Sequence, residues 1–155
     1  MTFRLHGLDP APFAPLFALD DASLARRGMR RVVADSDMGY PCRVGLEDAR
    51  MGEELLLLHW QHVPDDTPYR ASGPIFVRRQ SRRRVLPPGE VPGYVSRRLI
   101  SLRAYDATWT MLDARVCAGA GVADELALMF RGAAVACVHL HNARRGCYSC
   151  AAYRD

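Results

Sequence analysis

The sequence has no lysine: its 21 basic side chains are all arginine, and they give a formal net charge of +4. Such a bias is typical of some genome compositions. It also indicates a possible anion site, because guanidinium groups bind carboxylates and phosphates through paired hydrogen bonds. A net charge of +4 is too small to indicate nucleic acid. We therefore expect a small anionic ligand as partner and do not expect nucleic acid.

Long hydrophobic runs are also absent. The runs that occur, such as Leu55–Leu58, are far below the roughly 18 residues that a membrane span needs. The first residues, Met1–His6, lack the apolar segment of a secretory signal. The five cysteines are odd in number, which argues against a disulfide framework. We expect free thiols, no membrane association and a cytoplasmic location.

The remaining composition is that of a folded domain, with 49% hydrophobic and 25% charged residues. A length of 155 residues suits one globular domain over 1–155. Alternation, glycines and prolines predict strands at 3–8, 30–34, 53–63, 73–79, 98–105, 110–117, 135–141 and 147–152. Helices are predicted at 12–19, 21–27 and 123–131. The fold class is α+β, a mixed or mostly antiparallel sheet of six to eight strands with a few packed helices.

Histidines occur in two close pairs. His139 and His141 are two apart on a predicted strand, so they share a face with Cys137. Two adjacent imidazoles can hold a metal or carry a proton, or they can simply form a polar strand end. His59 and His62 are three apart on a strand, which sends them to opposite faces and predicts no joint site.

Cys147 and Cys150 form a single Cys-x-x-Cys motif. A structural zinc site normally needs four ligands, which His139 and His141 could complete in an unusual order. This structural metal site is kept as an alternative. Our primary assignment contains no metal ligand, and the cofactor stays unknown.

Four blocks resemble the family called domain of unknown function 1203. They are Gly39–Arg43, Pro68–Val77, Ser101–Asp106 and His139–Tyr148. The blocks keep the family's order over nearly the whole chain. Cys147 lies within the last block and Cys150 outside it. The resemblance supplies no reaction, cofactor or catalytic residue.

The function is therefore unknown, and the main hypothesis is a small-ligand pocket for an anion, with enzymatic activity left open. Catalytic candidates are His141, Cys147 and Cys42, and ligand-binding candidates are Arg43, Tyr69, Arg70, Arg103, His139 and Asn142. The alternative is a non-catalytic interaction module that uses Arg82–Arg84 in the long loop Gln80–Gly93. The oligomeric state stays open.

Overall fold

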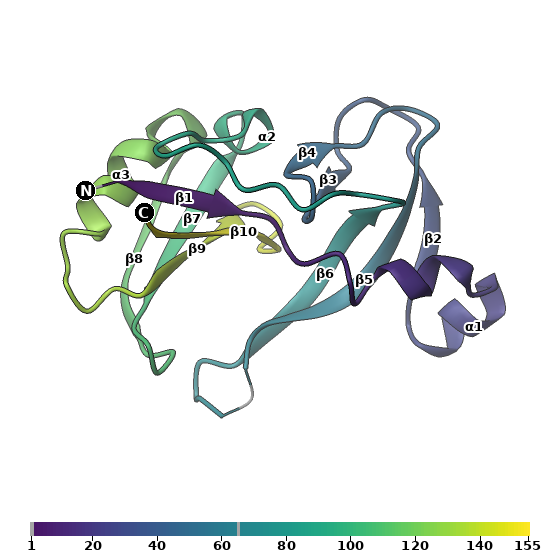
Figure 1. Cartoon of the computed structure of the whole chain (residues 1–155), viewed down its shortest axis with the longest axis horizontal. Helices are drawn as coiled ribbons and strands as arrows, with labels where there is room; N and C mark the ends of the chain where they lie inside the picture. The colour runs from purple at the N-terminus through teal and green to yellow at the C-terminus, as the bar shows by residue number, and fades with distance from the viewer. Residues whose placement is uncertain (1, 65) are drawn as a thin grey trace.

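The computed structural model describes residues 2–64 and 66–155 and arranges its strands in two five-stranded sheets (Figure 1). The first sheet has the order β1 (Phe3–His6), β10 (Tyr148–Arg154), β9 (Cys137–Asn142), β7 (Leu99–Tyr105) and β8 (Met111–Ala118). The second has the order β2 (Arg30–Val33), β5 (Glu54–Val63), β6 (Ala71–Arg78), β3 (Pro41–Cys42) and β4 (Glu47–Asp48). Neighbouring strands are antiparallel except for the parallel pair β3–β6.

Helices are few and short. They are η1 (Ala14–Ala18), α1 (Asp21–Arg26), α2 (Gly93–Ser96), η2 (Gly119–Gly121) and α3 (Val122–Met129). The α+β class and the mostly antiparallel pairing are confirmed, although the fold is mostly β. The prediction of one sheet with six to eight strands is wrong, because the strands divide between two sheets. No helix in the described part of the chain is long and apolar enough to cross a membrane.

Local sequence signals explain several elements. The Asp20 side chain accepts a hydrogen bond from the Ser23 backbone N–H at 2.7 Å and so caps α1. Gly28 follows with a φ of 70°, a left-handed conformation that ends helices. The leucines of β5 pack on both sides of their strand. Leu55 lies in a cluster with Ala34, whereas Leu56 lies in a different cluster, as expected for a central strand.

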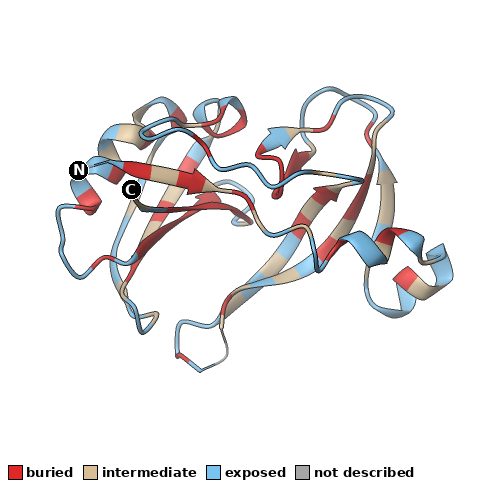
Figure 2. Ribbon diagram, viewed as in Figure 1, coloured by how far each residue is buried: buried red, intermediate tan, exposed pale blue. Residues whose placement is uncertain are grey.

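Two hydrophobic clusters position the sheets. In one cluster, Leu102 and Leu140 of the first sheet pack against Leu126 of α3. The other joins the two sheets, because it combines Leu58 of β5 with Tyr148 of β10. β9 is buried along its whole length, as Figure 2 shows. Side chains on the face of β9 opposite Leu140 therefore lie between the sheets.

The long loop after β6 returns to the first sheet. Its backbone pairs with the first strand and the segment after it: Gly7 N–H donates to Arg84 O and Leu86 N–H donates to Leu5 O, at 2.8 and 3.0 Å. Figure 1 shows this segment running beside β1 from one sheet to the other. The predicted surface loop is thus held to the fold by backbone hydrogen bonds.

Candidate functional site

A cleft of about 750 Å³ lies between the two sheets. The second sheet and the segment before it contribute an apolar side, which includes Pro41, Leu57, Pro74 and Phe76. The first sheet contributes the β9–β10 turn and the segment that enters β7. Five arginines line the cleft: Arg43, Arg97, Arg98, Arg144 and Arg145. The cleft therefore combines guanidinium groups with an apolar wall.

Arg43 is the buried member of this group, with a relative exposure of 2%. Its guanidinium donates to Tyr148 O at 2.8 Å and to Pro41 O at 2.5 Å, and so connects the two sheets. Its remaining nitrogen, Nη2, donates to Cys147 Sγ at 3.3 Å. Asn142 Nδ2 donates to the same sulfur, also at 3.3 Å. Two fixed donors thus hold the half-buried Cys147 side chain in the cleft.

The cleft has more positive than negative charge. Arg97 and Arg98 share one carboxylate, Asp48, at 3.1 and 3.2 Å. Arg144 and Arg145 have no side-chain hydrogen bond or ion pair with any described residue. A concave site lined with one sign of charge concentrates the field there and attracts counter-ions. Among the described residues, Asp48 alone pairs with arginines of the cleft, so most of the positive charge of the cleft is not neutralised by a carboxylate.

A second constellation lies deeper between the sheets. His62 of β5 meets His139 and His141 of β9, with ring centroids 5.7 and 4.8 Å from its own. One ring nitrogen of each histidine lies within 4.8 Å of those of the other two. The Tyr148 ring stacks on His62 at 5.3 Å with an interplanar angle of 11°. Three imidazoles from two sheets thus form one cluster.

Burial sets the charge of this cluster. The pKa is lowered to about 4 for His62 and His141 and to about 3 for His139. Removal from water is the largest cause, and the nearby Arg103 guanidinium contributes to each of these shifts. All three rings are therefore neutral at pH 7. His141 Nδ1 lies 3.0 Å from Gly146 O. His141 Nε2, His139 Nδ1 and His62 Nδ1 are buried without a hydrogen-bond partner among the described residues.

The strand periodicity predicted part of this cluster. His139 and His141 share a face, and His59 lies on the opposite side of β5 from His62. The His59 ring is exposed and forms a hydrogen bond with Ser72 Oγ at 2.8 Å. Sequence reasoning missed His62 as a member. Its only signal was its position on the buried side of a strand, with no indication of what it would meet.

The structure does not bring all the sequence candidates together. Cys42 is fully buried, and its sulfur lies 3.1 Å from Ser81 Oγ, outside the residues that line the cleft. Tyr69 and Arg70 are exposed in the turn between β5 and β6 and do not line it either. Arg103 pairs in register with His139 and so belongs with the histidine cluster. The cleft retains Arg43, Asn142 and Cys147.

The Cys-x-x-Cys pair is also separated. Cys150 packs in the core of the first sheet with Leu140, on the side away from the histidines. Cys147 is instead held by its two donors at the cleft. Within the described residues, the group whose geometry suits a metal contains His62, His139 and His141 and neither cysteine. The four-residue metal site considered from the sequence is therefore not assembled.

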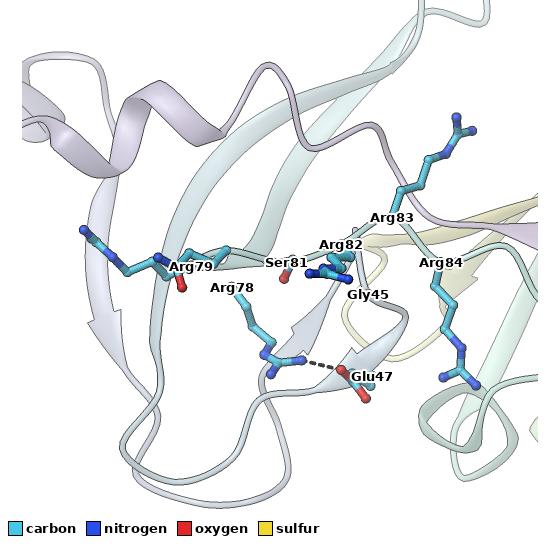
Figure 3. A pocket seen from close by; sticks show the side chains of 9 residues that line it. Gly45, Glu47, Arg78, Arg79, Ser81, Arg82, Arg83 and Arg84 are labelled. Atoms are coloured by element: carbon cyan, nitrogen blue, oxygen red, sulfur yellow. Dashed lines mark hydrogen bonds and ion pairs between the residues drawn. The ribbon is translucent and has the colours of Figure 1, made fainter.

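A second hollow, of about 420 Å³, lies along the arginine-rich loop (Figure 3). Here Arg78 pairs with Glu47 and Glu53, and Arg83 Nε donates to Gly7 O at 2.9 Å. Figure 3 shows Arg83 and Arg84 pointing in opposite directions. These guanidinium groups do not converge on one point.

Comparison with known proteins gives a family but no activity. The family model described as Protein of unknown function (DUF1203) matches residues 39–154. No curated protein and no solved structure matches the chain. The matched range contains both the cleft and the histidine cluster, and it confirms the resemblance found in the sequence. The chain belongs to the family of unknown function DUF1203.

Proposed function

We propose that the cleft between the sheets binds a small organic anion that has an apolar body. The observation that carries this proposal is the pair Arg144 and Arg145, which line the cleft without a partner among the described residues. A carboxylate or phosphate that pairs with them replaces water around two cations by charge-assisted hydrogen bonds. Arg97 and Arg98 add positive charge on the same side, partly offset by Asp48.

The opposite wall specifies the rest of the ligand. Leu57, Pro74 and Phe76 present apolar surface to the cleft. A volume of about 750 Å³ lies within the roughly 300–1,000 Å³ typical of small-molecule sites. Such sites are mainly apolar, and a few polar groups orient the ligand. A compact anion without an apolar part would leave this wall unused.

A second candidate function, thiol chemistry on the bound anion, is favoured by the geometry around Cys147. Cys147 is half-buried and lines the cleft, and Arg43 and Asn142 donate hydrogen bonds to its sulfur. Nucleophilic catalysis needs an oriented and accessible sulfur next to the substrate. In this proposal Arg43 is a positioning residue, because carbonyl groups already occupy two of its nitrogens.

The cytoplasmic location stays a prediction.

A thermal-shift screen tests the anion proposal. Each carboxylate or phosphate ester is compared with its neutral amide or alcohol analogue. We expect anions with an apolar body to raise the melting temperature and their neutral analogues to have less effect. The double variant Arg144→Ala/Arg145→Ala should lose the response.

The control variant is Arg82→Ala/Arg84→Ala, which removes the same charge from exposed arginines outside the cleft. It should retain the response, because these arginines lie outside the cleft. A nonspecific effect of charge would instead reduce the response equally in the two double variants. The proposal is wrong if no anion stabilises the protein, or if both double variants lose the response equally.

A further inference from the structure

The histidine cluster contains ring nitrogens that can act as metal ligands and that have no hydrogen-bond partner among the described residues. Its buried members, His139 and His141, are 2% and 1% exposed. A buried polar atom without a hydrogen bond is energetically unfavourable, so such atoms are rare in folded proteins. Here each of the three rings has one such nitrogen. The cluster therefore holds three buried ring nitrogens, one on each histidine, without a hydrogen-bond partner among the described residues.

One ring already has the orientation of a ligand. His141 Nδ1 contacts the Gly146 carbonyl oxygen at 3.0 Å, and a carbonyl can only accept, so Nδ1 carries the proton. This leaves the lone pair on Nε2, the nitrogen without a partner. In metal sites, a hydrogen bond from the second ring nitrogen to a carbonyl or carboxylate fixes the tautomer in this way.

We propose that His62, His139 and His141 bind one divalent first-row transition-metal ion, with Zn²⁺ as the reference ion, and leave a coordination position open. Neutral imidazoles are good ligands for zinc, copper, nickel and iron. Three protein ligands plus a free position is the arrangement of catalytic zinc sites, whereas structural sites use four. The described residues add no carboxylate or cysteine to the group.

The spacing needs only a small adjustment. Zinc–nitrogen bonds of about 2.0–2.1 Å place the nitrogens of a tetrahedral site about 3.3 Å apart. One ring nitrogen of each histidine here lies within 4.8 Å of those of the other two. The remaining difference, about 1.5 Å at most for each pair of nitrogens, is what metal binding would have to close. His62 is half-buried and so gives the ion a route from solvent.

The surroundings determine what the open position would take. Arg103 pairs in register with His139 on the neighbouring strand, so its positive charge opposes a bare cation and favours an anion or hydroxide as fourth ligand. The rings of Tyr105, Trp109 and Tyr148 surround His139 at 5.2–5.4 Å. An aromatic wall keeps the site poor in water, which strengthens the metal–ligand interactions.

The test is a metal titration of the full-length, tag-free protein after chelation. Zn²⁺ affinity is measured by competition with a chromophoric chelator, and Co²⁺ is used as a spectroscopic probe. We expect one equivalent to bind, with the intense visible absorption of a four- or five-coordinate Co²⁺ site. His62→Gln removes a ligand and should weaken binding at least as much as loss of an outer-shell partner, which costs roughly 10–100-fold. His59→Gln is the matched control on the same strand and should leave the affinity unchanged.

His62 is the most solvent-accessible of the three, so its replacement disturbs folding least. Circular dichroism checks that both variants fold. The proposal is overturned if the wild-type protein binds no stoichiometric Zn²⁺, if Co²⁺ gives only the weak spectrum of an octahedral site, or if His59→Gln weakens binding as much as His62→Gln. The Co²⁺ spectrum decides the question even if the His62 variant does not fold.

Discussion

The metal-free protein should lose stability as the pH falls from 7.5 to 5. The perturbation is protonation of buried histidines, which have a lower pKa in the folded state than in the unfolded chain. Between pH 6.5 and 4 the unfolded chain binds more protons, so acid favours unfolding. Above pH 6.5 both states are neutral at these positions, and this contribution to the pH dependence disappears.

The magnitude follows from His141, which is 1% exposed and has a pKa lowered to about 4. A drop in the pKa of His141 from 6.5 to about 4 corresponds to a total contribution of about 3 kcal/mol to the free energy of unfolding. About 2 kcal/mol of this contribution is lost when the pH falls to 5. His139 has an even lower pKa and adds to the loss of stability. The repulsion between the protonated His139 and His141 rings is counted only once in this sum. A small domain has only about 5–15 kcal/mol of stability, so the effect is large.

The assay is guanidinium chloride unfolding at both pH values in the presence of a chelator. Carboxylates do not confuse the result, because those with a lowered pKa, such as Asp20 and Asp106, titrate below this range. His141→Gln should have a smaller loss between pH 7.5 and 5, and His59→Gln should match the wild type. A free energy of unfolding that is equal at the two pH values would refute the reasoning. So would an undiminished loss in His141→Gln.

Three further predictions concern other parts of the structure. Arg43→Lys should destabilise the protein by about 1–3 kcal/mol in chemical unfolding, because lysine has one donor nitrogen where arginine has three, and buried carbonyl oxygens are left without a hydrogen bond. Unchanged stability would contradict the role of Arg43 in connecting the two sheets. Iodoacetamide should alkylate Cys147 before Cys42 and Cys150, which are 0% and 1% exposed. Peptide mass spectrometry measures the order of alkylation, and equal rates would contradict the accessible position of Cys147 at the cleft. Leu58→Ala should cost about 2–5 kcal/mol because it opens a cavity between the sheets, and a cost below about 1 kcal/mol would argue against that packing.

Features that depend on near neighbours could be predicted from the sequence. The cap of α1 needs only Asp20 and Ser23, three residues apart. The hairpin of β7 and β8 needs only its turn, where the Asp106 side chain accepts the Thr108 N–H at 2.8 Å. The shared face of His139 and His141 follows from the period of a strand. Each of these signals lies within a few residues of the feature.

Features that depend on distant segments could not be predicted. The division into two sheets depends on pairings such as Cys42 with Phe76, which no local pattern specifies. His62 joins the cluster only because the second sheet packs on the first. Arg144 and Arg145 lie in the β9–β10 turn and were not among the sequence candidates, because their position in the cleft depends on where that turn lies relative to β6. Cys42 was a catalytic candidate, but it is fully buried in a hydrophobic cluster.

The most direct test of the anion-binding proposal is the ratio of two dissociation constants for one ligand scaffold. Isothermal titration calorimetry compares the best carboxylate from the screen with its primary amide, which has the same shape and no charge. We predict at least about 10-fold preference for the carboxylate in the wild type, since a hydrogen bond to a charged group is worth roughly 1.5–3 kcal/mol. The preference should disappear in Arg144→Ala/Arg145→Ala. Equal affinity for both ligands in the wild type would contradict the account.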